Sequence, residues 1–350
     1  MDLAFTDISA TLVLMFRPYA GDGPEPIGVL LIPKFAAIAF FSAIEPLRVA
    51  NRLAGRELFA WRSLSENGGP IEASNGMRFM VDGALAEAAR LPTLIVCSSF
   101  DPQLHESKTL LAALRRLSRA GIVLGALDTG AHILAKAGLL EALPVTMHWE
   151  AVPGFREEFP EIEVSEELFE VQRRCFTCAG GTAALDMMLD MIGRKHGLAL
   201  ARAVSEQFIH DRIRSSSDHQ RMERGTRLQI TNRKALTIID LMERNLEQPL
   251  DGPRLAAASG ITPRQMERLF RTLLQTSPIG FYRKLRLERA RSLLRQTDMT
   301  VTEIALATGF SSASVLSRRY GEHYGIAPRN DRSDRLPARG RPDEIAVVPR

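Results

Sequence analysis

The chain has 350 residues, of which 45% are apolar, and its 45 Lys and Arg slightly outnumber its 41 Asp and Glu. This length is enough for two or three domains with hydrophobic cores of their own. No run of about 18 apolar residues occurs, which excludes a membrane-spanning helix, and three cysteines are typical of a reducing compartment. The N-terminus lacks the basic segment and cleavage site of a signal peptide, so we expect a cytoplasmic protein.

The charge is distributed unevenly along the chain. Residues 1–225 carry 23 basic and 28 acidic side chains, whereas residues 226–350 carry 22 basic and 13 acidic ones. An excess of positive charge in one part of a protein favours contact with nucleic-acid phosphates. The C-terminal part is therefore the expected nucleic-acid-binding part of the chain.

The first part of the chain alternates short apolar runs with helical patterns. Residues 1–25 end in the Gly/Pro-rich sequence GDGPEP and are interpreted as a loosely held arm. Strands that alternate with helices predict a parallel sheet covered on both faces, with right-handed crossovers. We therefore expect an α/β flavodoxin-like sensor domain over residues 26–212. Its predicted elements are buried strands at 27–33, 93–99 and 122–127, and helices at 36–54 and after each of the later strands.

In a parallel sheet of this kind, ligands bind where a strand ends and a helix begins. The sharpest such place is the elbow Leu127-Asp128-Thr129-Gly130-Ala131-His132, directly after the third strand. In hydrolases a nucleophile stands on such a turn, but here it carries Asp128 or Thr129 with no obvious base beside them. All three cysteines lie elsewhere, so the elbow lacks the thiolate of a Cys–His enzyme. We therefore expect ligand binding and assign no catalytic residues.

Cys175 and Cys178 have the C-x-x-C spacing of a redox pair or of half a zinc site. No second C-x-x-C or nearby His pair completes a metal site. We interpret the two cysteines as small residues on a buried strand, and we expect neither a metal nor another cofactor.

Two helices and a polar stretch separate the α/β domain from the C-terminal part. Helical spacing predicts helices over residues 182–196 and 198–213. The sequence that follows, RSSSDHQRMERGT, is polar, and we place the interdomain linker at 213–233. The last residues, 332–350, have little apolar content and are expected to be disordered.

A unit is repeated in the C-terminal part. LAAASG at 255–260 recurs as IALATG at 304–309, and a helical pattern at 280–297 connects the copies. A short helix, a Gly turn and a second helix make the helix-turn-helix arrangement, although an ordinary αα-hairpin has the same spacing. Because the unit occurs twice, we favour the helix-turn-helix interpretation over the αα-hairpin. We predict an all-α double helix-turn-helix DNA-binding domain over residues 234–331.

The second helix of each unit is expected to enter the DNA major groove. Arginine reads guanine, glutamine reads adenine, and serine pairs with donors or acceptors. The residues predicted to read bases are Arg264, Gln265, Arg268, Ser312, Ser314 and Arg318. The residues predicted to contact phosphates are Arg271, Lys284 and Arg319.

The C-terminal part resembles the AraC/XylS family of bacterial transcription regulators over about residues 234–330. The second unit, IALATGFSSASVLSRRYGEHYGIAP, carries the likeness. The family usually has an aromatic residue where Leu316 stands and a Tyr-Arg pair after the last proline, where this chain has Arg329-Asn330. The resemblance implies a sequence-specific regulator, expected to be an activator, with promoter or operator DNA and RNA polymerase as partners.

Residues 27–200 resemble the PfpI-like, glutamine-amidotransferase-like sensor domain of GlxA-type regulators. In that superfamily the elbow often carries Cys, where this chain has Asp128. An acidic helix residue matching Glu45 points at the elbow, and the family His matches His148, for which a hydrogen-bonded structural role is the alternative. The resemblance implies a domain that binds a small-molecule effector and forms a homodimer. It rests on the segments 42–61, 125–140, 146–160 and 179–197.

Within this group the likeness is closest to regulators that sense glycine betaine, dimethylglycine or carnitine. Proteins hold quaternary ammonium groups with aromatic faces, for which Trp149 and Phe100 are candidates, although both are equally expected as core residues. The elbow amides suit a ligand carboxylate, which an ionised Asp128 would repel. The residues predicted to bind the ligand are Glu45, Phe100, Asp128, Thr129, Gly130, His148 and Trp149. The alternative to a regulator is a PfpI-like amidase or glyoxalase-type enzyme with a DNA-binding appendage.

Overall fold

The computed structural model describes residues 19, 21–140, 144–172, 175–221 and 224–333. The chain divides into two compact units, residues 1–221 and 222–350, and each is described by itself. Most of the predicted N-terminal arm and nearly all of the predicted disordered tail lie outside the described residues. No helix in the described part of the chain is both long and apolar enough to cross a membrane.

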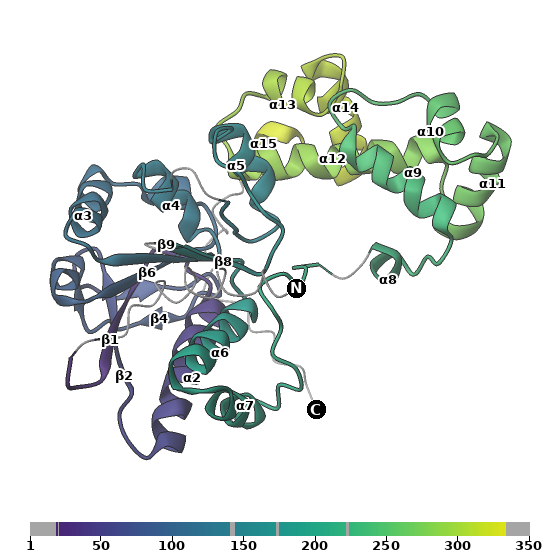
Figure 1. Ribbon diagram of the computed structural model, residues 1–350. Helices are drawn as coiled ribbons and strands as arrows, with labels where there is room; N and C mark the ends of the chain where they lie inside the picture. Colours follow the sequence, from purple (N-terminus) through teal and green to yellow (C-terminus); the bar gives the residue numbers. More distant parts are fainter. Residues whose placement is uncertain (1–18, 20, 141–143, 173–174, 222–223, 334–350) are drawn as a thin grey trace, which may run out of the picture. The chain divides into compact units, whose positions relative to one another are not determined.

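The first unit is built on one seven-stranded sheet with helices on both faces (Figure 1). β8 runs antiparallel to β9 at one edge, and the other neighbouring strands are parallel, which confirms the predicted α/β architecture. Cys175 and Cys178 lie on β9, the strand expected for them, where Cys178 is buried and Cys175 is partly buried. In their order across the sheet, the strands are β5 (Gly83–Ala84), β2 (Phe59–Ser65), β1 (Glu25–Leu31), β6 (Thr93–Cys97), β7 (Val123–Leu127), β9 (Cys175–Cys178) and β8 (Phe169–Val171).

Two hydrophobic clusters cover the two faces of this sheet. Val29 and Ile95 pack on one face with α2, α6 and α7, while Leu30 and Val96 pack on the other with α3, α4 and α5. Because neighbouring residues of a strand point to opposite faces, a sheet buried on both faces needs strands that are apolar throughout. The helices are α2 (Ala37–Ala54), α3 (Lys108–Arg119), α4 (Gly130–Lys136), α5 (Val152–Glu158), α6 (Ala183–His196) and α7 (Leu198–Gln207), with short 3-10 helices η1 (Leu85–Arg90) and η2 (Pro102–His105) and a small hairpin of β3 (Ile71–Glu72) and β4 (Arg78–Phe79).

The helix predicted over residues 198–213 is shorter than expected, because α7 ends at Gln207. Ile209 has a left-handed backbone with φ of 54°, which cannot continue a right-handed helix. The hydroxyl of Ser205 donates a hydrogen bond to the carbonyl of His210 at 2.8 Å. The chain beyond α7 therefore leaves the helix axis, and residues up to Arg221 belong to the first unit.

The second unit is helical and is organised around one long helix, α12 (Pro278–Gln296) (Figure 1). Phe281 and Tyr282 near its start pack in one hydrophobic cluster, whereas Leu287 and Leu294 further along pack in another. One helix thus contributes to two separate cores. The other helices are α8 (Arg224–Leu228), α9 (Arg233–Arg244), α10 (Gly252–Ala258), α11 (Pro263–Leu274), α13 (Val301–Ala307), α14 (Ala313–Tyr324) and α15 (Pro328–Ser333).

Candidate functional site

Three charged residues with left-handed backbone stand beyond the carboxyl ends of three adjacent strands in the first unit. Lys34, Asp101 and Asp128 have φ values of 63°, 53° and 59°, and they follow β1, β6 and β7. Residues other than glycine are strained in this conformation, and such strain concentrates at functional sites. The ammonium group of Lys34 lies 3.2 Å from the carboxylate of Asp101. Strain and charge thus coincide at the edge where parallel sheets bind ligands.

Asp128 occupies the elbow between β7 and α4. Its amide donates a hydrogen bond of 3.0 Å to the carbonyl of Cys178 on β9, and the residue is only 7% exposed. Gly180 has a φ of 82°, and a Cβ atom at this position would lie 2.7 Å from the Cβ of Asp128. Only glycine therefore lets β9 approach the elbow so closely. Gly130, the first residue of α4, is buried behind it.

The environment of Asp128 changes its protonation. Burial raises the pKa of Asp128 to about 8, the amide of Thr129 lowers it, and the charge of Glu150 raises it. At neutral pH most of this carboxyl group is protonated, so it can donate a hydrogen bond and does not repel a ligand carboxylate as the sequence suggested. The nearby thiols are not nucleophiles either, because burial raises the pKa of Cys97 and raises that of Cys178 to about 12.

The segment that carries His148 and Trp149 lies beside the elbow. The amide of Thr146 donates a hydrogen bond to Oγ1 of Thr177 on β9 at 2.8 Å. Thr177 directly precedes Cys178, whose carbonyl accepts the amide of Asp128. The carboxylate of Glu150 is close enough for its charge to act on Asp128. The structure therefore brings residues 146–150 and the elbow together, although they are separated in sequence.

The two aromatic side chains of this segment differ in their roles. Burial lowers the pKa of His148, and its Nδ1 accepts a hydrogen bond of 3.4 Å from the amide of Glu150. His148 therefore shapes its own turn as a neutral ring. Trp149 is 40% exposed, and the guanidinium carbon of Arg221 lies 4.1 Å from the centre of its ring. The ring of Trp149 thus already contacts a cation.

Three other predicted ligand residues are engaged elsewhere or stand at the surface. Oγ1 of Thr129 donates to the carbonyl of Ser99 at 2.5 Å, which fastens the elbow to the end of β6. The carboxylate of Glu45 accepts hydrogen bonds of 2.8 and 2.6 Å from Arg48 on the same helix. Phe100 is 59% exposed, so it is not the core residue that the alternative interpretation required.

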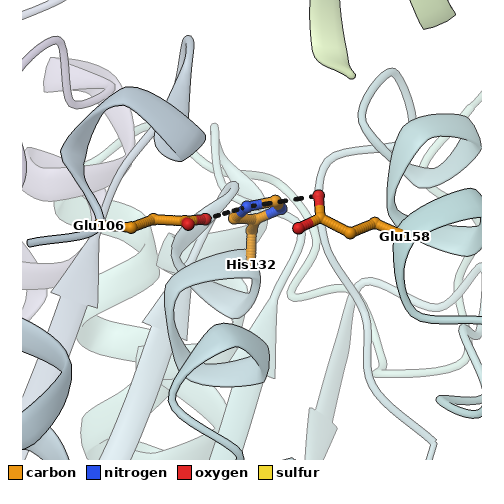
Figure 2. A group of neighbouring side chains, drawn as sticks. All are labelled: Glu106, His132 and Glu158. Atoms are coloured by element: carbon orange, nitrogen blue, oxygen red, sulfur yellow. Dashed lines mark hydrogen bonds and ion pairs between the residues drawn. The ribbon is translucent and has the colours of Figure 1, made fainter. Parts of the chain in front are cut away.

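A polar cluster joins the chain after η2 to α4 and α5 (Figure 2). Nε2 of His132 lies 2.5 Å from Glu106 and 3.9 Å from Glu158, and one ligand atom from each residue falls within 4.8 Å of the others. Imidazole and carboxylate groups can bind zinc. However, the ammonium of Lys136 lies 2.6 Å from Glu158 and 3.6 Å from Glu106. Since Lys136 already supplies positive charge, we interpret the cluster as a fastening of α5 to α4.

The two helix-turn-helix units have matching boundaries. Side chains of Asp251 and Thr262 cap α10 and α11 in the first unit, and those of Thr300 and Ser312 cap α13 and α14 in the second. Asp251 and Thr300, the caps of the first helix in each unit, are 49 residues apart. Thr262 and Ser312, the caps of the second helix, are 50 residues apart, because the second unit has one extra residue after the glycine turn. Both copies therefore fold alike, and the predicted pair of units is confirmed.

The residues predicted to read bases lie on the surface of α11 and α14. Arg264, Arg268 and Arg318 are exposed, and none of them forms an ion pair with a carboxylate within 4.0 Å among the residues that the structure describes. Their charge is thus available to DNA. Ser314 is exposed as well.

Gln265 and Ser312 are exposed but also cap their helices. Oε1 of Gln265 accepts the amide of Thr262 at 2.8 Å, and the hydroxyl of Ser312 accepts the amide of Val315 at 3.2 Å. Both side chains therefore stabilise the N-terminus of a helix that is expected to enter the major groove, α11 for Gln265 and α14 for Ser312. The predicted phosphate contacts are each paired with a glutamate on the same helix: Arg271 with Glu267 at 3.2 Å, Lys284 with Glu288 at 3.8 Å, and Arg319 with Glu322 at 2.8 Å.

The turn of the second helix-turn-helix unit is fastened to the rest of the domain. Gly309 has a φ of 68°, and a Cβ atom there would lie 2.6 Å from the carbonyl oxygen of Leu246 and 2.7 Å from that of Glu247. Arg286 on α12 donates to the carbonyls of Thr308, at 2.7 Å, and of Gly309. The turn thus packs directly against the chain after α9, which fixes the second helix-turn-helix unit relative to the first helix-turn-helix unit.

One structural residue of this domain was missed from the sequence. Asp331 directly follows Arg329-Asn330, which stand in place of the Tyr-Arg pair of the AraC/XylS family. Its buried carboxylate pairs with Arg291 and Arg295. In the sequence Asp331 stands as an acidic residue among Arg329, Arg332 and Arg335. Its partners lie 36 and 40 residues earlier, so local patterns did not identify them.

Two capped helix-turn-helix units on a shared helix, with exposed arginines that form no ion pair in the described part of the chain, define a DNA-binding transcription regulator. Residues 255–334 match the model of a helix-turn-helix domain, and residues 28–194 match that of the DJ-1/PfpI family. The chain is 47% identical to the HTH-type transcriptional regulator CdhR of Pseudomonas aeruginosa, over 87% of this chain and 90% of the relative. It is 42% identical to GbdR of the same species, over 90% and 86%. It is 37% identical to GlxA of Rhizobium meliloti, over 87% and 94%.

The chain therefore belongs to the GlxA-type regulators of the AraC/XylS family, which join a DJ-1/PfpI-like domain to a double helix-turn-helix domain. This membership confirms both resemblances inferred from the sequence.

Proposed function

We propose that the first unit senses a small amine that carries both a quaternary ammonium group and a carboxylate, such as glycine betaine or carnitine, and that this ligand controls transcription. The observation that carries the proposal is the strained, buried Asp128 at the elbow, beside the segment whose exposed Trp149 ring already contacts a cation. The face of Trp149 suits the ammonium group, and the protonated carboxyl of Asp128 can donate a hydrogen bond to the carboxylate.

The same features support sensing instead of catalysis. A protonated carboxyl and buried thiols with raised pKa values offer no nucleophile at the elbow. The rival function, hydrolysis of an amide or conversion of a glyoxal, is tested by incubating the full chain with such substrates. Turnover that disappears in Asp128→Ala would establish the enzyme and overturn this part of the proposal.

A thermal-shift panel tests the ligand class directly. Glycine betaine, dimethylglycine and carnitine are titrated against the full chain, with 3,3-dimethylbutanoate as a matched compound whose head group has no charge. A ligand that binds only the folded state stabilises it by RT ln(1 + [L]/Kd), or about 2.7 kcal/mol at a hundredfold excess over Kd. We expect betaine or carnitine to stabilise the protein and dimethylbutanoate not to do so.

The two tryptophans of the chain offer a matched pair of variants for this panel. Trp149→Leu should abolish the ligand-induced shift, because it removes the aromatic face. Trp61 on β2 is partly buried and packs against the hydrophobic cluster, so Trp61→Phe should keep the shift although it lowers stability. If no compound stabilises the wild-type chain, small-molecule control by a quaternary amine is wrong.

The remaining partners follow from this role. We infer a sensor domain over residues 26–212 and a DNA-binding domain over 234–331, joined by a linker. We also infer a cytoplasmic homodimer that activates transcription through contact with RNA polymerase. Sedimentation of the full chain, and transcription in vitro from its own operator with and without ligand, test these points.

A further inference from the structure

Residues 208–221, which we call the strap, run from the end of α7 to the end of the first unit and pack along it. The strap has no helix or strand of its own. It is nevertheless held along its length by side chains and backbone of the first unit. Because Met222 begins the second unit, the strap is the only covalent connection by which a ligand signal can leave the sensor.

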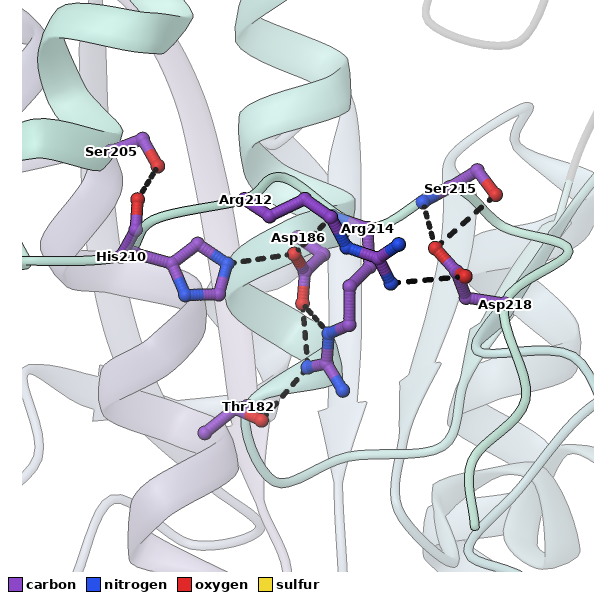
Figure 3. Close-up of polar contacts among 8 residues, drawn as sticks. All are labelled: Thr182, Asp186, Ser205, His210, Arg212, Arg214, Ser215 and Asp218. Atoms are coloured by element: carbon purple, nitrogen blue, oxygen red, sulfur yellow. Dashed lines mark hydrogen bonds and ion pairs between the residues drawn. The ribbon is translucent and has the colours of Figure 1, made fainter. Parts of the chain in front are cut away.

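The beginning of the strap is anchored on a buried carboxylate (Figure 3). Asp186 on α6 is fully buried, and it accepts hydrogen bonds from Nε2 of His210 at 2.9 Å and from the amide of Arg214 at 2.7 Å. The guanidinium of Arg214 adds a two-pronged ion pair and reaches Oγ1 of Thr182 at 2.8 Å. Charge-assisted, two-pronged contacts of this kind are among the strongest polar interactions. This anchor is firm.

The middle of the strap extends the edge of the sheet. The amide of Leu168, next to β8, donates to the carbonyl of Ser216 at 2.9 Å. Nε2 of Gln220 lies 2.9 Å from Oγ1 of Thr146 and 3.0 Å from the carbonyl of Met147. The strap therefore reaches the segment that carries the proposed ligand residues.

The end of the strap lies on the proposed ligand site itself. The guanidinium carbon of Arg221 is 4.1 Å from the centre of the Trp149 ring. That is the position, over an aromatic face, in which proteins bind quaternary ammonium groups. Unlike the buried Asp186, Trp149 is 40% exposed, so this contact can be exchanged without unfolding the core.

We propose that Arg221 acts as a built-in substitute for the ligand: its guanidinium covers Trp149 until a cationic effector takes the same face, and this exchange frees the end of the strap. The inference rests on the proposed function and adds its mode of regulation. One ring face holds one cation, so effector and Arg221 compete. Asp186 keeps the beginning of the strap in place, which confines the released segment to the residues between Arg214 and the second unit.

The competition makes a quantitative prediction. Occupation of the site by Arg221 reduces the apparent affinity by the fraction of molecules in which the site is open. Arg221→Ala should therefore bind glycine betaine or carnitine about tenfold more tightly than the wild-type chain, as isothermal titration would measure. Arg221→Lys, which keeps a cation, should fall between the two. Arg212→Ala is the matched control, because Arg212 belongs to the same strap but pairs with Asp218 at 3.1 Å.

Hydrogen exchange of the same proteins reports the release of the strap. The Leu168 amide is protected by Ser216, so saturating betaine should speed its exchange in the wild-type chain, and Arg221→Ala should show fast exchange without ligand. Equal betaine affinity in the wild type and Arg221→Ala would overturn this inference while leaving the proposed function intact. Unchanged Leu168 exchange on saturation would also overturn it. Absence of binding to both proteins would overturn the inference together with the proposed function.

Discussion

The phenol hydroxyl of Tyr320 donates a hydrogen bond of 2.5 Å to the carboxylate of Asp331. Tyr320 lies in the core of the second helix-turn-helix unit, and Asp331 on α15 is 2% exposed. Arg291 and Arg295 of α12 approach the same carboxylate to 2.8 and 2.7 Å. Burial alone would raise the pKa of Asp331. The hydrogen bonds from Tyr320, Arg295 and Arg291 together have the larger effect, so the pKa of Asp331 is lowered. One buried charge thus joins α12, α14 and α15.

Asp331→Asn should destabilise the second unit by about 2–4 kcal/mol, because it leaves two arginines without their carboxylate. Hydrogen exchange of the α14 amides in the full chain measures this loss. Glu288→Gln is the control, since this exposed carboxylate of α12 forms only a 3.8 Å ion pair and should cost less than about 0.5 kcal/mol. Equal losses in the two variants would contradict the assignment.

The lowered pKa of Asp331 also fixes the direction of a pH effect. The stabilisation of the folded state by ionised Asp331 should be fully present above the ordinary carboxyl pKa of 3.8. It should be lost as the pH falls through the lower pKa that Asp331 has in the folded chain. The wild type and Asp331→Asn should therefore converge in stability as the pH falls below the lowered folded pKa of Asp331. A difference that persists unchanged into acid would show that Asp331 contributes through shape and not through charge.

Two glycines of the second unit should respond oppositely to alanine. Gly309→Ala forces a Cβ into a left-handed turn and to within 2.6 Å of a backbone oxygen, so we expect a loss of at least about 2 kcal/mol. Gly321 lies inside α14, and a Cβ there meets nothing within 4 Å. Gly321→Ala should therefore stabilise the unit by about 0.5–1 kcal/mol. Thermal melts of the two variants compare them, and a shift of the same sign in both would contradict the role given to Gly309.

Local sequence patterns located the central strands and the long helices, but not the strands β2, β5 and β8. The strand predicted at 93–99 is Thr93–Cys97, and the helix predicted at 182–196 is Ala183–His196. Apolar runs, capping residues and glycine turns are signals that act within a few residues, and they also placed Asp128 on its elbow. The pattern did not show that α7 ends at Gln207, because a left-handed residue such as Ile209 leaves no mark in hydrophobic spacing.

The connections between distant segments were not predictable in this way. The pairing of Asp186 with Arg214, and that of Trp149 with Arg221, join residues 28 and 72 positions apart across a polar stretch. That stretch has the composition of a free linker, and only the folded sheet edge brings its partners within reach. The protonation of Asp128 likewise depends on burial by several strands, which composition does not reveal.

The raised pKa of Asp128 predicts a second pH effect, opposite in sign to that of Asp331. In the unfolded chain this carboxyl loses its proton near pH 3.8, whereas in the folded chain it keeps it up to about 8. Its protonated form therefore favours folding at low pH, and stability should fall as the pH rises from about 4 to about 8. Asp128→Asn keeps a neutral side chain that tolerates left-handed backbone, so it should be more stable than the wild type at pH 8. Urea unfolding at pH 5 and pH 8 tests this, and a pH-independent difference would contradict it.

The exposed arginines of the two reading helices should contribute separately to DNA affinity. Arg318→Ala and Arg268→Ala should each weaken binding to the operator by about 1–3 kcal/mol without lowering thermal stability, because each removes an unpaired guanidinium from α14 or α11. Arg271→Ala should instead weaken binding to all sequences alike. It should also reduce the slope of the logarithm of the binding constant against the logarithm of the salt concentration by about one. Arg244→Ala on α9, whose side chain is exposed and pairs with Asp240 at 2.9 Å, is the control and should bind as the wild type does. Fluorescence anisotropy with operator and unrelated DNA at two salt concentrations separates these effects, and unchanged operator affinity in Arg318→Ala would remove that residue from the reading surface.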